Sequence, residues 1–197
     1  MLRHRLLIPL SVLLLALGLA ACGGSSESDE DEVIDVIETS ATSPDPSNCI
    51  ELQTVAFNEQ STQASGNEAT KKCEEEAKEE EGTADSVEVS EVEVDGDTAT
   101  ATAAITGGDL DGQTVELEAV KDGDNWKLNE LTAFVDFDPT PIIAGLAEGL
   151  EEEESIEPKI ASCIIETLEN SDDSEIEELV LNTGPVSFEE LAESCIE

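Results

Sequence analysis

Apolar and polar residues alternate from Val87 to Leu128, a period of two that is typical of strands with one buried face. Three turn-forming segments divide this stretch: Asp95-Gly96, Gly107–Gly112 and Asp122–Asn125. The first strand changes parity midway, because Val87 and Val89 alternate out of step with Val92 and Val94. A β-bulge near Ser90 and Glu91 would return all four valines to one face. The pattern predicts a four-stranded antiparallel meander.

Before this sheet, apolar residues recur at helical spacing in three segments. The first segment carries Val33, Ile34, Ile37 and Ala41, and Pro44 and Pro46 end it. The second runs from about Ser47 to Phe57. A polar loop follows, and the third carries Ala69, Cys73 and Ala77. We expect these helices to cover the apolar face of the sheet, which makes the fold class α+β.

After the sheet the sequence favours helices again. Two apolar stripes at helical spacing are Ile142, Ile143, Leu146 and Leu150, then Ile160, Cys163, Ile164 and Leu168. Ser174 with Glu177 and Ser187 with Glu190 have the spacing of capping boxes and predict two further helix starts. We therefore expect a small all-α tail over residues 138–197, closed by a disulfide.

Four cysteines follow the first 22 residues: Cys49, Cys73, Cys163 and Cys195. Four cysteines allow three pairings. We predict the sequence-local pairing, Cys49 with Cys73 and Cys163 with Cys195, because each pair brackets a helical unit. Each disulfide would stabilise the fold by about 3 to 4 kcal/mol. We expect no metal site, because these cysteines are far apart in sequence and the single histidine, His4, lies in the N-terminal segment.

The N-terminal segment has the organisation of an export signal. Arg3 and Arg5 precede an apolar run from Leu6 to Ala20, which is shorter than the roughly 20 residues that a membrane-spanning helix needs. Leu19-Ala20-Ala21-Cys22 closes the run and resembles the lipobox of bacterial lipoproteins. The alternative is an ordinary secretory signal followed by an incidental cysteine.

The lipoprotein resemblance implies cleavage before Cys22 and attachment of a diacylglyceryl group to its thiol. Residues 1–21 are then a signal peptide, and residues 22–32 are an acidic flexible tether. Acylation of Cys22 also leaves an even number of thiols for disulfides. We expect a lipid-anchored protein on the extracytoplasmic side of the cell membrane.

The chain is strongly acidic, with 49 Asp and Glu against eight Lys and Arg and a formal net charge of −41. Loss of Arg3 and Arg5 with the signal would leave six lysines and a net charge of about −43. Coulomb repulsion then excludes nucleic acid and anionic headgroups as partners, so the acyl chains alone would make the membrane contact. Such composition resembles that of halophilic proteins. In those proteins, concentrated salt screens the repulsion among the acidic side chains. Calcium binding is the alternative, but Asp109–Gly112 and Asp122–Asn125 lack the EF-hand pattern.

Two motifs carry a resemblance to a known fold. They are Val92-Glu93-Val94-Asp95-Gly96-Asp97-Thr98-Ala99-Thr100-Ala101 and Asp122-Gly123-Asp124-Asn125-Trp126-Lys127-Leu128. With the preceding helices, they resemble the NTF2-like superfamily, in particular its small exported members of actinobacteria. The resemblance implies a cone over residues 33–137 that encloses an apolar pocket, with Trp126, Phe134, Leu117 and Val115 as candidate lining. The same side chains would also fit an ordinary hydrophobic core.

The residues that acid–base enzymes of this fold depend on are scarce here. NTF2-like isomerases and dehydratases use Asp, His or Tyr inside the cone, whereas the mature chain has no His, Tyr or Arg. Asp35 and Glu38, among the apolar residues of the first helix, are the candidates for a carboxylate site. We predict a non-catalytic envelope protein without a cofactor that binds a partner protein or a small apolar ligand. The alternatives are a purely structural lipoprotein and an isomerase or dehydratase.

Overall fold

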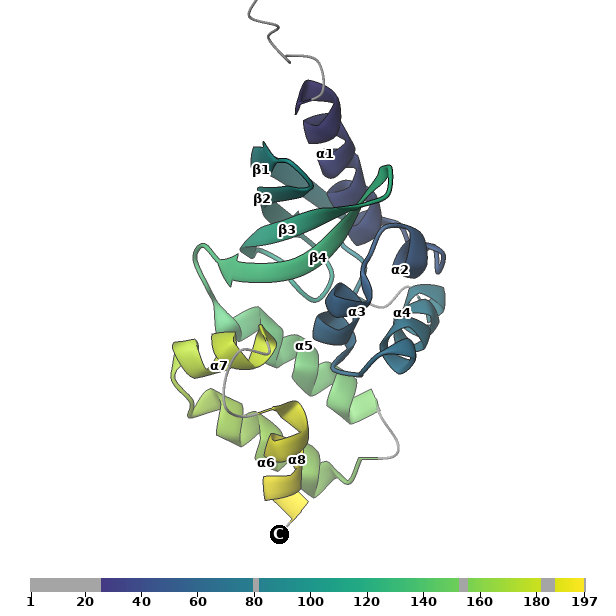
Figure 1. The fold of residues 1–197 in the computed structure, drawn as a ribbon. Helices are drawn as coiled ribbons and strands as arrows, with labels where there is room; N and C mark the ends of the chain where they lie inside the picture. The colour runs from purple at the N-terminus through teal and green to yellow at the C-terminus, as the bar shows by residue number, and fades with distance from the viewer. Residues whose placement is uncertain (1–25, 80–81, 153–155, 182–186, 197) are drawn as a thin grey trace, which may run out of the picture.

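The computed structural model describes residues 26–79, 82–152, 156–181 and 187–196. Its centre is a four-stranded antiparallel sheet in the order β1-β2-β3-β4 (Figure 1). The strands are β1 (Ser86–Asp95), β2 (Thr98–Thr106), β3 (Thr114–Asp122) and β4 (Asn125–Phe134). Each strand pairs with the next one in the chain, so the predicted meander and the α+β class are confirmed.

The parity change in β1 is a β-bulge, as predicted. The register of β1 against β2 shifts between Ser90 and Glu93, and Glu91 has a left-handed φ of 52°. The extra residue lets valines on both sides of the bulge face inward. Their partners are buried alanines of β2: Val89 pairs with Ala103 and Val94 with Ala99.

The first hairpin turn lies one residue later than predicted. Asp95 still pairs with Thr98, so the two turn residues are Gly96 and Asp97. Gly96 has a φ of 67°, which a glycine adopts without steric strain. The glycine therefore takes the first turn position, where the backbone must enter the left-handed region.

Helix α1 (Ser26–Thr42) packs on the inner face of the sheet, against β1 and β4. Its residues Val33, Val36 and Ile37 are buried. The sheet contributes Ala99, Ala101, Ala103, Val115, Leu117, Ala119, Trp126, Leu128 and Phe134 to the same core. Because α1 begins at Ser26, the predicted flexible tether is wrong for residues 26–32; residues 22–25 lie outside the described part of the chain.

The second predicted helix is broken into α2 (Asn48–Glu51) and α3 (Val55–Thr62). The intervening backbone pairs with the outer edge of β4: the Leu128 N–H donates to the Leu52 carbonyl, and the Thr54 N–H donates to the Leu128 carbonyl, each at 2.8 Å. Thr54 then caps α3 by accepting from the Phe57 N–H. Helical periodicity cannot reveal this break, because its cause is a strand about 75 residues later in the chain.

Helix α4 (Asn67–Glu79) is the third predicted helix. The disulfide between Cys49 and Cys73 joins α2 to α4, with a Cα–Cα distance of 6.0 Å. It closes the short helices α2, α3 and α4 into one layer beside the sheet (Figure 1).

The tail consists of α5 (Pro139–Glu152), α6 (Pro158–Glu169), α7 (Asp173–Val180) and α8 (Phe188–Ile196). Its helices enclose a second core formed by Ile164, Leu168, Ile176, Leu179, Leu191 and Cys195. The disulfide between Cys163 and Cys195 joins α6 to α8, so both disulfides have the predicted pairing. Within the described residues, no helix combines the length and the apolar character that crossing a membrane requires.

One of the two predicted capping boxes is present. Ser187 and Glu190 bond reciprocally: the Ser187 N–H donates to the Glu190 carboxylate at 3.0 Å, and the Glu190 N–H donates to Ser187 Oγ at 3.2 Å. The box predicted at Ser174 is wrong. Helix α7 begins at Asp173, two residues earlier than a cap at Ser174 predicts, and its cap is Asp172, whose N–H donates to the Glu175 carboxylate. Asp caps a helix as well as Ser does, and Asp172 with Glu175 has the same spacing two residues upstream of the predicted pair.

Two glutamine side chains hold the tail against the sheet and the helices beside it. Gln113, which is buried, donates to the Asp138 carbonyl at 2.8 Å and accepts from the Asp138 N–H at 3.3 Å. Gln60 of α3 donates to the carbonyls of Leu131 in β4 and Leu181 after α7, and its oxygen accepts from the Leu131 N–H. The start of the tail and the end of α7 are therefore both tied to the sheet layer.

We predict that replacing Cys163 and Cys195 together by serine will lower the free energy of unfolding by about 3 to 4 kcal/mol. The disulfide closes a loop of 32 residues, and its loss raises the entropy of the unfolded chain. Urea denaturation followed by circular dichroism measures the change. Glu193→Gln, at an exposed position of α8, is the control. A double variant as stable as this control would contradict the prediction.

Gln60→Ala should lower the free energy of unfolding by about 1 to 3 kcal/mol, because it leaves backbone groups of Leu131 and Leu181 without their partner. Hydrogen exchange should show the largest increase at Leu131, whose N–H loses its acceptor. Ser61→Ala, at the next and exposed position of α3, is the control. Equal exchange at Leu131 in both variants would show that the Gln60 side chain does not protect this amide, and would contradict the prediction.

Candidate functional site

The four residues predicted to line a pocket inside the cone lie in the hydrophobic core. Val115, Trp126, Leu117 and Phe134 are 0%, 2%, 6% and 8% exposed. They share one cluster with Val33 and Ile37 of α1 and with Leu181 from the end of α7. A pocket among the described residues lies elsewhere, in the helical tail.

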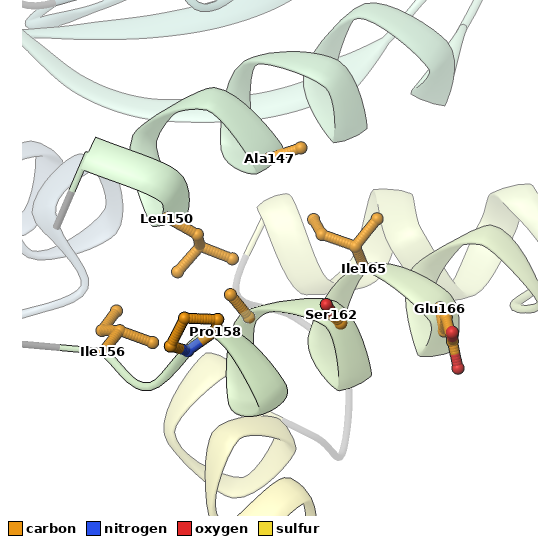
Figure 2. A pocket seen from close by; sticks show the side chains of 8 residues that line it. Ala147, Leu150, Ile156, Pro158, Ser162, Ile165 and Glu166 are labelled. Atoms are coloured by element: carbon orange, nitrogen blue, oxygen red, sulfur yellow. The ribbon is translucent and has the colours of Figure 1, made fainter. Parts of the chain in front are cut away.

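This pocket is an open groove of about 370 Å³ between α5 and α6, which we call the α5–α6 groove. Its lining residues are Ala147, Leu150, Ile156, Pro158, Ala161, Ser162, Ile165 and Glu166. Figure 2 shows Leu150 of α5 and Ile165 of α6 pointing into the space between the two helices. Ile156 and Pro158 lie at one end of the groove and Glu166 at the other.

The groove exists because α6 is apolar over two adjacent faces. One face carries Ile164 and Leu168, which are buried in the tail core. The other carries Ala161 and Ile165, four residues apart and therefore one turn apart on the same side of the helix. The predicted stripe from Ile160 to Leu168 described the first face and missed the second. The signal for the second face was present in the sequence, as an apolar pair flanked by Pro158.

The chemistry of the groove suits binding. Ser162 and Glu166 are its polar lining residues, and both are exposed. Among the described lining residues there is no histidine or thiol, and no hydrogen bond joins the Ser162 hydroxyl to the Glu166 carboxylate, so the groove shows no activated nucleophile. In the described ranges, no cluster of three or more His, Cys, Asp or Glu side chains could hold a metal ion. An apolar surface with a polar rim can exclude water from a ligand without reacting with it.

The carboxylates considered for acid–base work lie outside this groove. Asp35 is exposed on α1, and Glu38, one turn later, is partly buried. Neither lines the α5–α6 groove. The structure therefore does not bring these two carboxylates to the cavity it describes.

A polar cluster that the sequence did not reveal ties α1 to the β3–β4 hairpin. Asp29 Oδ1 accepts from Lys121 Nζ at 2.6 Å and from Trp126 Nε1 at 3.1 Å. The Lys121 ammonium also lies 5.2 Å from the centroid of the Trp126 ring, within range of a cation–π interaction. Asp29 precedes its partners by more than 90 residues, so no local pattern predicts the contact.

The cluster shifts the protonation equilibria of both charged groups. Hydrogen bonds from Lys121 and then from Trp126 hold the pKa of Asp29 below its ordinary value of 3.8. The hydrogen bond to Asp29 raises the pKa of Lys121 above its ordinary value of 10.5. Asp29 therefore stabilises the fold fully above pH 3.8 and loses this effect as the pH falls through its lowered pKa. Lys121 stabilises below pH 10.5 and loses its effect as the pH rises through its raised pKa.

We predict that Asp29→Asn will lower the melting temperature at neutral pH. Below pH 4, the melting temperature of the variant should depend less on pH than that of the wild type. The substitution removes the group whose charge stabilises the fold above its lowered pKa. Trp126 is the single tryptophan of the chain, so its fluorescence reports directly on the cluster. Asp31→Asn, an exposed change of the same charge on α1, is the control. Identical acid melting profiles for the two variants would contradict the prediction.

Comparison with known proteins identifies no relative from which a function could be transferred. No family model matches the chain, and no curated protein or solved structure matches it. The architecture is α+β, with a four-stranded antiparallel sheet, helices and two disulfides.

Proposed function

We propose that this chain is a lipid-anchored protein of the extracytoplasmic face of the cell membrane that acts by binding and not by catalysis. The observation that carries the binding role is the α5–α6 groove, an open groove lined mainly by apolar residues. Among its described residues, no hydrogen bond activates Ser162 and no cluster of side chains could hold a metal ion. Its chemistry supports retention of a partner and not conversion of a substrate.

The anchor proposal is supported by the lipobox at Leu19–Cys22 and by the position of α1. Three residues lie between Cys22 and Ser26, where α1 begins, so the connection of four Cα–Cα steps spans at most about 14 Å. The start of α1 and the helical tail lie at opposite ends of the molecule (Figure 1). A protein acylated at Cys22 would therefore present the α5–α6 groove away from the membrane surface.

For the fold, we propose an NTF2-like cone followed by a docked helical tail. Helices that precede a bulged four-stranded meander, together with the motifs at Val92–Ala101 and Asp122–Leu128, support this assignment. The packed interior of the cone supports a scaffold role for this part of the chain, because α1 and Leu181 occupy its apolar face. We further propose that the acidity is an adaptation to concentrated salt, which screens repulsion among 49 carboxylates.

The test of this function is native mass spectrometry of the full protein, extracted from its own membranes in mild detergent. We expect a mass that corresponds to cleavage before Cys22, a diacylglyceryl group and two disulfides, together with a bound companion. Cys22→Ser should lose the lipid and leave the membrane fraction, whereas Ser28→Ala, an exposed change on α1, should keep both.

Each outcome decides a separate part of the proposal. An unmodified Cys22 thiol in wild type would refute lipid anchoring. A lipidated protein that carries no companion under these conditions would favour a structural envelope role over binding. Turnover of a small acidic or carbonyl compound by the purified protein would revive the isomerase or dehydratase alternative.

A further inference from the structure

We propose that the α5–α6 groove binds an amphipathic helix with a cationic polar face, presented by a partner protein. The inference rests on the proposed binding function and specifies the chemistry of the partner. Three features of the tail support it: the shape of the groove, the charge around it and the exposure of its rim.

The shape of the groove fits a helix. Its walls are two helices, and the lining residues follow helical spacing: Ala147 with Leu150 on α5, and Ala161 with Ile165 on α6. A third helix laid along such a seam can place residues spaced three and four apart between these ridges. The small side chains Ala147 and Ala161 leave room for the larger apolar side chains of a partner.

The charge around the groove selects a cationic partner. The described side chains of α6 and its N-terminal flank include three exposed glutamates, Glu157, Glu166 and Glu169, against one lysine, Lys159. Among the described residues, neither Glu157 nor Glu166 forms a salt bridge, so both remain available for a partner. A second copy of this chain would place acidic side chains against acidic side chains at contact distance, where salt screens least. Basic side chains that flank an apolar stripe would instead complement the rim.

The exposure of the rim favours an elongated partner over a small apolar ligand. Ser162 and Glu166 are exposed, and Ile165 is only partly buried. Sites for small ligands generally enclose most of the ligand surface. A helix, in contrast, buries one face in an open groove and leaves its polar face in water.

The experiment measures binding of a synthetic probe to the full mature lipoprotein in phosphatidylcholine nanodiscs. The probe is a fluorescent 18-residue helical peptide with leucines on one face and lysines on the other. A second peptide has the same leucines but glutamates in place of the lysines. Fluorescence anisotropy gives the dissociation constants, and empty nanodiscs correct for binding of the peptide to lipid.

Two arginine variants on α6 make the test specific to the groove. Ser162→Arg places a positive charge and a long side chain in the groove, whereas Thr167→Arg makes the same change of net charge at an exposed position outside it. We expect Ser162→Arg to weaken binding of the lysine peptide by about tenfold or more and Thr167→Arg to weaken it by less than about twofold. Circular dichroism shows whether both variants keep the fold.

The outcomes separate the inference from the function on which it rests. Equal weakening by Ser162→Arg and Thr167→Arg would show general charge attraction, and equal binding of the glutamate peptide would show that charge does not select the partner. Either result overturns the inference, as does no binding of the lysine peptide. In each case a companion seen by native mass spectrometry would leave the proposed binding function standing.

Discussion

The burial of one face of α1 against the inner face of the sheet is the interaction on which the rest of the structure depends. Val33 and Ile37 are almost completely buried there, together with Val115 and Trp126. A sheet with one polar and one apolar face cannot be stable in water until the apolar face is covered. This requirement is strict in a chain with a net charge of −41, because repulsion among carboxylates opposes every compact state.

Sequence patterns predicted the parts of the fold that local forces determine. The strands, the bulge beside Ser90, the Ser187–Glu190 cap and the local disulfide pairing depend on neighbours in the chain or on a repeating pattern. Two predictions from sequence patterns were wrong where a contact with a distant residue determines the local structure. The break after α2 depends on β4, and the early start of α1 coincides with the bonds of Asp29 to the β3–β4 hairpin.

For the candidate site, too, the sequence pattern indicated which residues face inward but not what packs against them. Trp126 and Phe134 were correctly identified as inward-facing, but periodicity alone cannot distinguish the wall of a cavity from a filled core. The filling comes from α1 and from Leu181, a residue of the distant tail. The α5–α6 groove was missed because both faces of α6 are apolar, and only the tertiary arrangement shows which of them the tail core covers.

The two edges of the sheet are protected from pairing with another chain in different ways. The backbone of Leu52 and Thr54 already occupies part of the outer edge of β4. The other edge strand, β1, carries the bulge at Glu91 and exposed glutamates, including Glu88 and Glu93. Bulges and charges on edge strands hinder pairing with another chain. The bulge and charges on β1, and the backbone that covers part of β4, therefore limit the edge-to-edge pairing from which an aggregate could grow.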